Sequence, residues 1–291
     1  MMRSFPLLLL ASLVGGPVHA QAPGPLDEAV ETITPADIRG RIEVLADDSM
    51  LGRDTPSPGL ERAAKYVIAE FQRLGLRPAG DSGTYEQRYG LSRWTVDTAA
   101  SSLEVSARGA KAAVAFGGDV RVIGGEVSGK SISGHAILVA GPLGPAATRD
   151  PRLRDRIVLL APDFARPLPF DLGDRVDEIV AAARAVIILS NRDSTSFTRR
   201  IDSALEPRLT PDYRDAEAEA PVVEVRESAL GSVAAVAALD LARLRELDSA
   251  VVRDLPDLRV DLRIARRYLQ RATAPNLIAV LEGRDPRRRH E

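Results

Sequence analysis

The segment Asp47 to Tyr89 reads DDSMLGRDTPSPGLERAAKYVIAEFQRLGLRPAGDSGTYEQRY. It begins with a Pro- and Gly-rich loop over residues 51–59 and continues with an apolar stripe at helical spacing: Leu60, Ala64, Val67, Ile68, Phe71 and Leu74. Gly75 is typical of the residue that ends a helix, and Leu76 can supply the hydrophobic contact that follows such an end. The segment therefore predicts an amphipathic helix over residues 60–74, and its stripe needs a partner surface.

A second helix is predicted on the N-terminal side of this segment. Thr34 is a good capping residue, Pro35 fits the first helical position, and Asp37 lies where the acid of a capping box lies. Ile38, Ile42 and Leu45 then repeat at helical spacing, and the pattern ends at residues 47–49.

The C-terminal side is dominated by strand patterns. Short apolar runs between turn residues predict strands over residues 85–96, 103–106, 113–116, 120–123, 135–140, 156–161, 185–190, 221–225, 258–264 and 276–281. Helical patterns cover 175–184 and 228–247, and the polar, Pro-containing stretch 191–220 predicts a long loop. The fold class expected from this mixture is α+β.

The composition is that of a folded, charge-balanced protein. Of 291 residues, 45% are hydrophobic and 27% are charged, which argues against wholesale disorder and coiled coil. The formal net charge of -2 gives no global electrostatic reason to bind nucleic acid or an anionic membrane. With no Cys, the chain has no disulfide, thiolate metal site or cysteine nucleophile.

Residues 1–20, MMRSFPLLLLASLVGGPVHA, have the pattern of a signal peptide. Arg3 precedes an apolar run that is shorter than the roughly 20 residues of a spanning helix, which disfavours an uncleaved anchor. Val18 and Ala20 are small residues at the positions that precede a cleavage site. We therefore expect cleavage after Ala20, a periplasmic or secreted protein, and no membrane attachment afterwards.

Several stretches resemble metallopeptidase family 28, the secreted two-zinc aminopeptidase type. At the N-terminal side these are Leu51-Gly52-Arg53, Pro58-Gly59, the amphipathic helix, residues 74–78 and the turn at residues 80–85. The tail TAPNLIAVLEG, residues 273–283, resembles the strand that re-enters the catalytic domain of that family. Residues of about 115–250 resemble a protease-associated domain, through DRIVLL (155–160), AVIIL (185–189) and APVV (220–223).

This resemblance implies a protease-associated domain inserted in a partial α/β zinc-exopeptidase domain. The inserted domain is then a β-rich sandwich or barrel with flanking helices. The implied divisions are residues 1–20 as signal peptide, 21–114 as the N-terminal part of a peptidase-like domain, 115–250 as the inserted domain, and 251–291 as return strands toward a catalytic domain that is absent from this sequence.

The sequence departs from the family where the zinc ligands should be. The expected chain after cleavage contains only His135 and His290, and neither is followed two residues later by Asp. A two-metal site needs several converging His and carboxylate ligands. We therefore assign no catalytic, cofactor-binding or metal-binding residue, and expect zinc only in a complete family member.

Two functions remain open at this stage. The chain is either the non-catalytic part of an aminopeptidase-like protein, inactive as given, or a stand-alone binding module for proteins or peptides. Possible partners are a peptide or protein ligand, the missing catalytic domain, or a second copy of the chain. Translation of the DNA downstream of the Glu291 codon distinguishes the two, because a His-x-Asp strand there supports the first.

Other motifs are interpreted structurally. GGEVSGKS, residues 124–131, matches the phosphate-loop pattern, but a strand pattern follows where a helix is required, so a Gly-rich hairpin loop is expected. His135 and Ser131, Ser133, Ser190 and Ser196 lack the context of a catalytic triad. The acidic groups Asp47-Asp48 and Asp212/Asp215/Glu217/Glu219 are expected to be solvated, Arg287 to Arg289 to be a frayed terminus, and Trp94 and Phe71 to be core residues.

Overall fold

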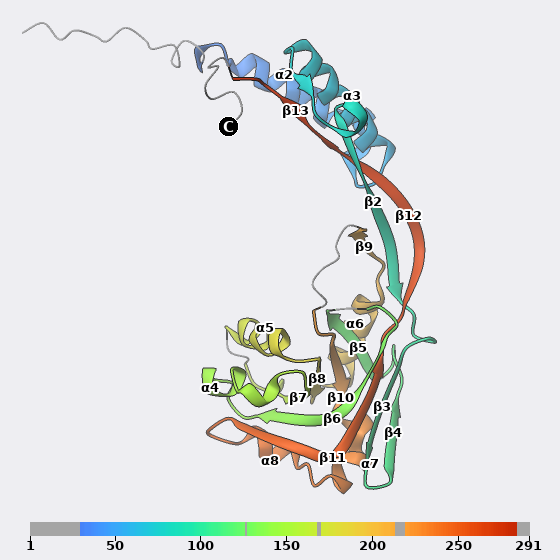
Figure 1. Ribbon diagram of the computed structural model, residues 1–291, viewed down its shortest axis with the longest axis vertical. Coiled ribbons are helices and arrows are strands. Elements are labelled where there is room, and N and C mark those ends of the chain that lie inside the picture. The colour runs from blue at the N-terminus through green and yellow to red at the C-terminus, as the bar shows by residue number, and fades with distance from the viewer. Residues whose placement is uncertain (1–29, 126, 168–169, 213–218, 284–291) are drawn as a thin grey trace, which may run out of the picture. The chain divides into compact units, whose positions relative to one another are not determined.

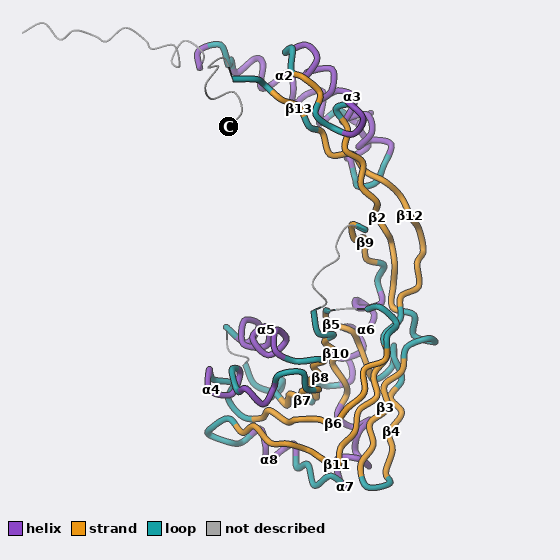
Figure 2. The backbone as a smooth tube through the Cα atoms, viewed as in Figure 1, coloured by secondary structure: helices purple, strands orange, loops and turns teal. Residues whose placement is uncertain are grey.

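The computed structural model describes residues 30–125, 127–167, 170–212 and 219–283. The signal-peptide prediction, His290 and Arg287 to Arg289 lie outside these residues. The chain divides into two compact units, the first ending at Val67 and the second beginning at Ile68. Each unit is described by itself below, and Figures 1 and 2 show the elements of both.

The first unit contains α2 (Pro35–Ala46), a 3₁₀ segment η1 (Asp48–Arg53) and most of α3 (Pro58–Arg73). The predicted capping box is confirmed: the Asp37 amide donates to the Thr34 hydroxyl, and the Thr34 amide donates to the Asp37 carboxylate. A glycine is required at position 59 because the backbone of Met50 passes close to it. A Cβ at this position would lie 1.9 Å from the Met50 carbonyl oxygen. The loop predicted over residues 51–59 is thereby held against the start of α3.

The apolar stripe of α2 is largely exposed in the described residues, whereas most of the stripe of α3 is partly buried. Ala64 is buried, but Ile38 and Ile42 are 50% and 59% exposed. Because residues four apart lie on one face of a helix, these two side chains form a continuous apolar surface on α2.

We predict that this surface causes self-association. The double variant Ile38→Asp, Ile42→Asp should remain monomeric at protein concentrations where the parent chain associates, because charge on an exposed apolar face opposes its burial. Light scattering at rising concentration measures the effect, and the Arg39→Glu, Glu43→Arg exchange on the same helix is the control. A parent chain that stays monomeric at high concentration would contradict the prediction.

The second unit begins with the end of α3. Gly75 has a φ of 68°, its amide donates to the Gln72 carbonyl, and the Leu76 amide donates to the Phe71 carbonyl. This is the predicted glycine helix end. The ring of Phe71 contacts that of Tyr85, with ring centroids 5.9 Å apart.

Next come β1 (Arg77–Pro78), a 3₁₀ segment η2 (Asp81–Gly83) and β2 (Glu86–Val96). β1 pairs with β13 (Ala279–Val280). β2 runs beside β12 (Arg266–Leu277) over its whole length and also pairs with β9 (Arg208–Pro211) (Figure 2). Trp94 of β2 is buried, as predicted, and its indole donates to the Thr210 hydroxyl at 3.0 Å.

An eight-stranded mixed sheet forms the main body of the second unit. Its strand order is β4-β3-β11-β6-β7-β8-β10-β5. The bounds are β3 Ser102–Ala107, β4 Ala110–Val114, β5 Val120–Gly124, β6 Ser131–Ala140, β7 Ile157–Ala161, β8 Ala185–Ser190, β10 Val222–Arg226 and β11 Val251–Arg263. The strands β6, β7, β8 and β10 are parallel neighbours, and the other pairs are antiparallel.

Helices cover both faces of this sheet (Figure 1). They are α4 (Pro145–Thr148), η3 (Pro151–Leu153), α5 (Leu172–Ala182), α6 (Ser194–Leu205), η4 (Glu227–Leu230), α7 (Gly231–Val236) and α8 (Leu241–Arg245). Alternate residues of each parallel strand enter opposite cores, so Leu138 packs on the α7 side while Val139 packs on the α5 side. The predicted sandwich or barrel is instead an open sheet with helices on both faces.

Several predicted elements differ from the structure. The predicted loop over 191–220 contains α6 and β9, and the predicted strand over 113–116 is β4, which ends at Val114. The predicted helix over 228–247 is interrupted because Ala238 has a φ of 53° and Asp240 caps a new helix by accepting from the Arg243 amide. The strand predicted over 276–281 is divided between β12 and β13.

The predicted boundaries at residues 115 and 250 cut through one sheet. β3 and β4 precede residue 115 and β11 follows residue 250, yet all three pair within the eight-stranded sheet. β11 also begins earlier than residue 258, and its register against β6 shifts between Leu255 and Arg259, around Pro256. The overall architecture is a mixed α/β fold.

Candidate functional site

A cavity of about 430 Å³ lies at the carboxyl ends of the parallel strands. Residues that line it include Gly141 to Leu143 after β6, Pro162 to Phe164 after β7, and Arg192 after β8. Parallel strands bring such residues together because their carboxyl ends meet at one edge of the sheet. The volume falls within the roughly 300–1,000 Å³ of small-ligand sites.

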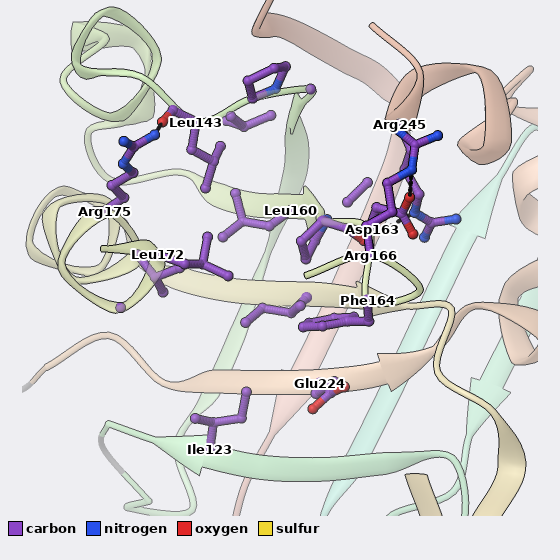
Figure 3. Close-up of a pocket in the computed structure, with 18 of the residues that line it drawn as sticks. Ile123, Leu143, Leu160, Asp163, Phe164, Arg166, Leu172, Arg175, Glu224 and Arg245 are labelled. Atoms are coloured by element: carbon purple, nitrogen blue, oxygen red, sulfur yellow. Dashed lines mark hydrogen bonds and ion pairs between the residues drawn. The ribbon is translucent and has the colours of Figure 1, made fainter. Parts of the chain in front are cut away.

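The walls of the cavity are mainly apolar. The sheet contributes Val139, Leu160 and Ile188, all on the face that packs against α5, and α5 contributes Leu172 and Val176. Figure 3 shows Leu143, Leu160 and Leu172 on one side of the site, with Phe164 and Glu224 on another. Such walls fit an apolar part of a ligand.

A buried ion cluster lines the same cavity. Glu224 of β10 is 1% exposed, and its carboxylate accepts from two guanidinium groups. Arg121 of β5 donates through Nε at 2.7 Å and through Nη2, both to Oε2. Arg192 donates through Nε to Oε1 at 3.1 Å. Two cations therefore share one carboxylate, which leaves a surplus positive charge on this cluster.

Arg192 is held in a poorly hydrated place. Its guanidinium carbon lies 3.8 Å from the centre of the Phe164 ring, a cation–π contact. Burial is the largest cause that lowers the pKa of Arg192, and the charge of Arg200 acts in the same direction, whereas Glu224 opposes both. The lowered pKa agrees with a cation that is only partly compensated.

Three other charged residues that line the cavity, Asp163, Arg166 and Arg175, take part in ion pairs of their own. Arg166 pairs with Asp163 at 3.1 Å, and Arg175 pairs with Asp171 at 2.6 Å. The hydrogen bond from the Asn191 side chain is the largest cause that lowers the pKa of Asp163, so this carboxylate stays ionised at neutral pH.

Arg245 joins the ends of two strands beside the cavity. It donates to the Pro162 carbonyl at 3.1 Å, to the Leu189 carbonyl at 3.3 Å and to the Glu227 carboxylate. Figure 3 shows Arg245 above Asp163 in that view. The connections that follow β7 and β8 are thereby fixed where they line the site.

Of the residues singled out from the sequence, Ser133 and His135 of β6 line one cavity, but the Ser133 hydroxyl donates to the carboxylate of Asp261. His135 lies exposed on β6, while Ser190 is buried at the end of β8. Asp212 accepts a hydrogen bond from the Ser92 hydroxyl at 2.5 Å, so it is held against β2 where a solvated loop was predicted. Asp215 and Glu217 lie outside the described residues. Within the described ranges, no group of three or more His, Asp or Glu side chains could hold a metal ion.

The segment resembling a phosphate loop connects β5 to β6, with residue 126 outside the described part. These two strands are not neighbours in the sheet, so the predicted hairpin is wrong. Strand β6 begins at Ser131, where a phosphate loop would begin a helix. Gly125 approaches another backbone closely, since a Cβ there would lie 2.2 Å from the Ala220 carbonyl oxygen.

Sequence reasoning missed the ion cluster, although one signal was present. Glu224 is the only charged residue in the run PVVEV, which was correctly predicted as a strand. A lone acid inside an apolar strand predicts a buried carboxylate that needs cationic partners. The partners could not be identified because Arg121 and Arg192 lie on distant segments of the chain.

Comparisons with known proteins find little similarity to this chain. No family model matches the chain, and no curated protein matches it. Among solved structures, it is similar to a crystal structure of a peptidase M28 precursor from Shewanella amazonensis SB2B, at 14% identity and a TM-score of 0.33. The match covers 84% of this chain and 50% of the other, so the chain spans half the length of that protein. In the described residues, no helix is both long and apolar enough to cross a membrane.

Proposed function

We propose that this chain is an exported, non-catalytic peptide-binding unit and that its ligand occupies the cavity beside α5. The proposal rests on the cavity, which has apolar walls, a volume suited to a small ligand or a peptide end, and a few charged groups at one side. A site of this kind at the carboxyl ends of parallel strands is a common place for ligands.

The proposal is compatible with both of the functions that the sequence leaves open. As a part of an aminopeptidase-like protein, the unit would bind peptides beside a catalytic domain carried elsewhere. As a stand-alone module, it would bind them without any hydrolysis. The signal-peptide pattern of residues 1–20 supports export in either case.

Filling the cavity from α5 should abolish peptide binding. We expect calorimetric titration of the chain 21–291 with N-acetyl-Ala-Leu, as the free acid or as the amide, to show binding that the Val176→Phe variant loses for both peptides. Val180→Phe is the matched control, because Val180 lies one turn further along the same helix and packs in the same core but does not line the cavity. Equal binding by the parent chain and Val176→Phe would contradict the proposed site.

We expect that this chain does not hydrolyse peptides. The whole sequence holds three His residues, too few near one another for the ligand set of a two-zinc site. We expect turnover of aminoacyl chromogenic substrates with added zinc to equal the blank, and the same preparation should still bind N-acetyl-Ala-Leu. Turnover well above the blank that a chelator removes would contradict this.

A further inference from the structure

One cluster of charges that lines the cavity holds two cations and one carboxylate, while Asp177, which also lines the cavity, is exposed on α5. Glu224 is the single carboxylate between Arg121 and Arg192, and all three side chains are largely buried. Arg166, Arg175 and Arg245 each have a carboxylate of their own in Asp163, Asp171 and Glu227. Among the described residues, the Arg121–Glu224–Arg192 cluster therefore has one more cation than carboxylates, and it is buried, whereas Asp177 is exposed.

A buried surplus charge is unfavourable unless an opposite charge can reach it. Both arginines line the cavity, so an anion inside it would be within reach of their remaining donors. Arg192 also stacks on Phe164, which itself lines the cavity. The cation is thus placed directly beside an apolar wall.

We propose that the cavity selects the C-terminal carboxylate of a peptide whose last residue is apolar. This rests on the proposed function and adds the chemical class of the ligand. The terminal residue carries its carboxylate and its side chain on the same carbon, which matches a cationic cluster that adjoins apolar walls. An acidic side chain would bring a carboxylate without an apolar group beside it.

Three peptides and the chain 21–291 test the assignment by calorimetric titration. They are N-acetyl-Ala-Leu as the free acid, the same peptide as its amide, and N-acetyl-Glu-Leu amide. The free acid should bind about tenfold or more tightly than either amide, because a charge-assisted contact in a poorly hydrated site is stronger than a neutral one. Equal binding of the acid and its own amide would overturn the inference but leave the proposed function standing.

Variants of Arg192 test whether this side chain causes the preference for the free acid over the amide. Arg192→Gln should bring the affinity ratio of acid to amide close to one, while Arg192→Lys should keep part of the preference because it retains the charge. Arg226→Gln is the matched control: Arg226 is 18% exposed against 16% for Arg192, pairs with Asp119 at 2.9 Å and lies over the Phe197 ring, but does not line the cavity.

The remaining outcomes are also decisive. A Glu-containing amide that binds as tightly as the free acid would overturn the choice of a terminal carboxylate. A preference that survives in Arg192→Gln and also in Arg121→Gln would overturn the assignment to this cluster. Binding of none of the three peptides would remove the proposed function together with this inference. Thermal melts check whether each variant is folded. The acid-to-amide affinity ratio of the parent chain tests the preference for the free acid even if a variant fails to fold.

Discussion

Replacing Glu224 with Gln should lower the free energy of unfolding by about 3–5 kcal/mol, the usual cost of breaking a buried ion pair by removing one partner. Gln keeps the shape of the side chain but removes the charge that compensates Arg121 and Arg192. Two guanidinium groups would then remain in a poorly hydrated cluster with no carboxylate between them. Urea denaturation followed by circular dichroism measures the loss.

Glu104→Gln is the control for this experiment. Glu104 is an acid on strand β3 of the same sheet, but its partner Lys111 is well exposed to solvent. Solvent screens an exposed ion pair and leaves it little net effect on stability, so this variant should unfold at nearly the parent urea concentration. Losses of equal size in the two variants would show that the Glu224 cluster is not the buried, charge-compensating group described above.

Local structure could be predicted where short-range chemistry determines it. The capping box at Thr34 and Asp37 and the glycine end of α3 at Gly75 depend only on neighbouring residues, and both were confirmed. Buried strands such as AVIILS, residues 185–190, were also predicted correctly because a continuous apolar run favours them.

Helix α6 was not predicted because its composition is mainly polar. Its sequence STSFTRRIDSAL contains only a narrow apolar stripe, and the segment was predicted as part of a loop. Two signals were present in the sequence. Asp193 caps the helix by accepting from the Ser196 amide at 2.9 Å, and Phe197, Ile201 and Ala204 recur at helical spacing and are buried.

Pairing between distant segments could not be predicted from local pattern. The ion cluster joins β5, β10 and the connection after β8, and β11 lies between β3 and β6, which precede it by more than 100 residues. A strand pattern indicates which face is apolar but does not identify the neighbour that covers it. The division at residues 115 and 250 followed the resemblance, whereas the sheet extends on both sides of it.

Because the main sheet extends beyond residues 115 and 250, we expect only a fragment that contains the whole sheet to fold. Expressed alone, residues 91–272 should unfold cooperatively, whereas residues 115–250 should not. The longer piece keeps all eight strands of the main sheet, and its two ends are register partners, since Leu91 pairs with Ala272. The shorter piece loses β3, β4 and β11 and exposes the edge of β6.

The buried side chains lost with those three strands determine the outcome. The large ones among them are Leu103, Val105, Val114, Leu255, Leu258, Val260 and Leu262. Each contributes roughly 1.5–3 kcal/mol when buried, so their joint loss is on the order of 10 kcal/mol or more. A domain of this size is stable by only about 5–15 kcal/mol in total. The shorter piece should therefore lack a cooperative native state.

Urea denaturation and amide hydrogen exchange distinguish the two pieces. Residues 91–272 should give a single sigmoidal transition and strong protection of the amides in β6, β7 and β8, which lie in the middle of the sheet. Residues 115–250 should give a gradual change and little protection. Cooperative unfolding of the shorter piece would show that β6 to β10 and β5 form a sufficient core, and would restore the boundaries at 115 and 250. The cavity depends on the same parallel strands, so a peptide that binds to residues 91–272 should fail to bind the shorter piece.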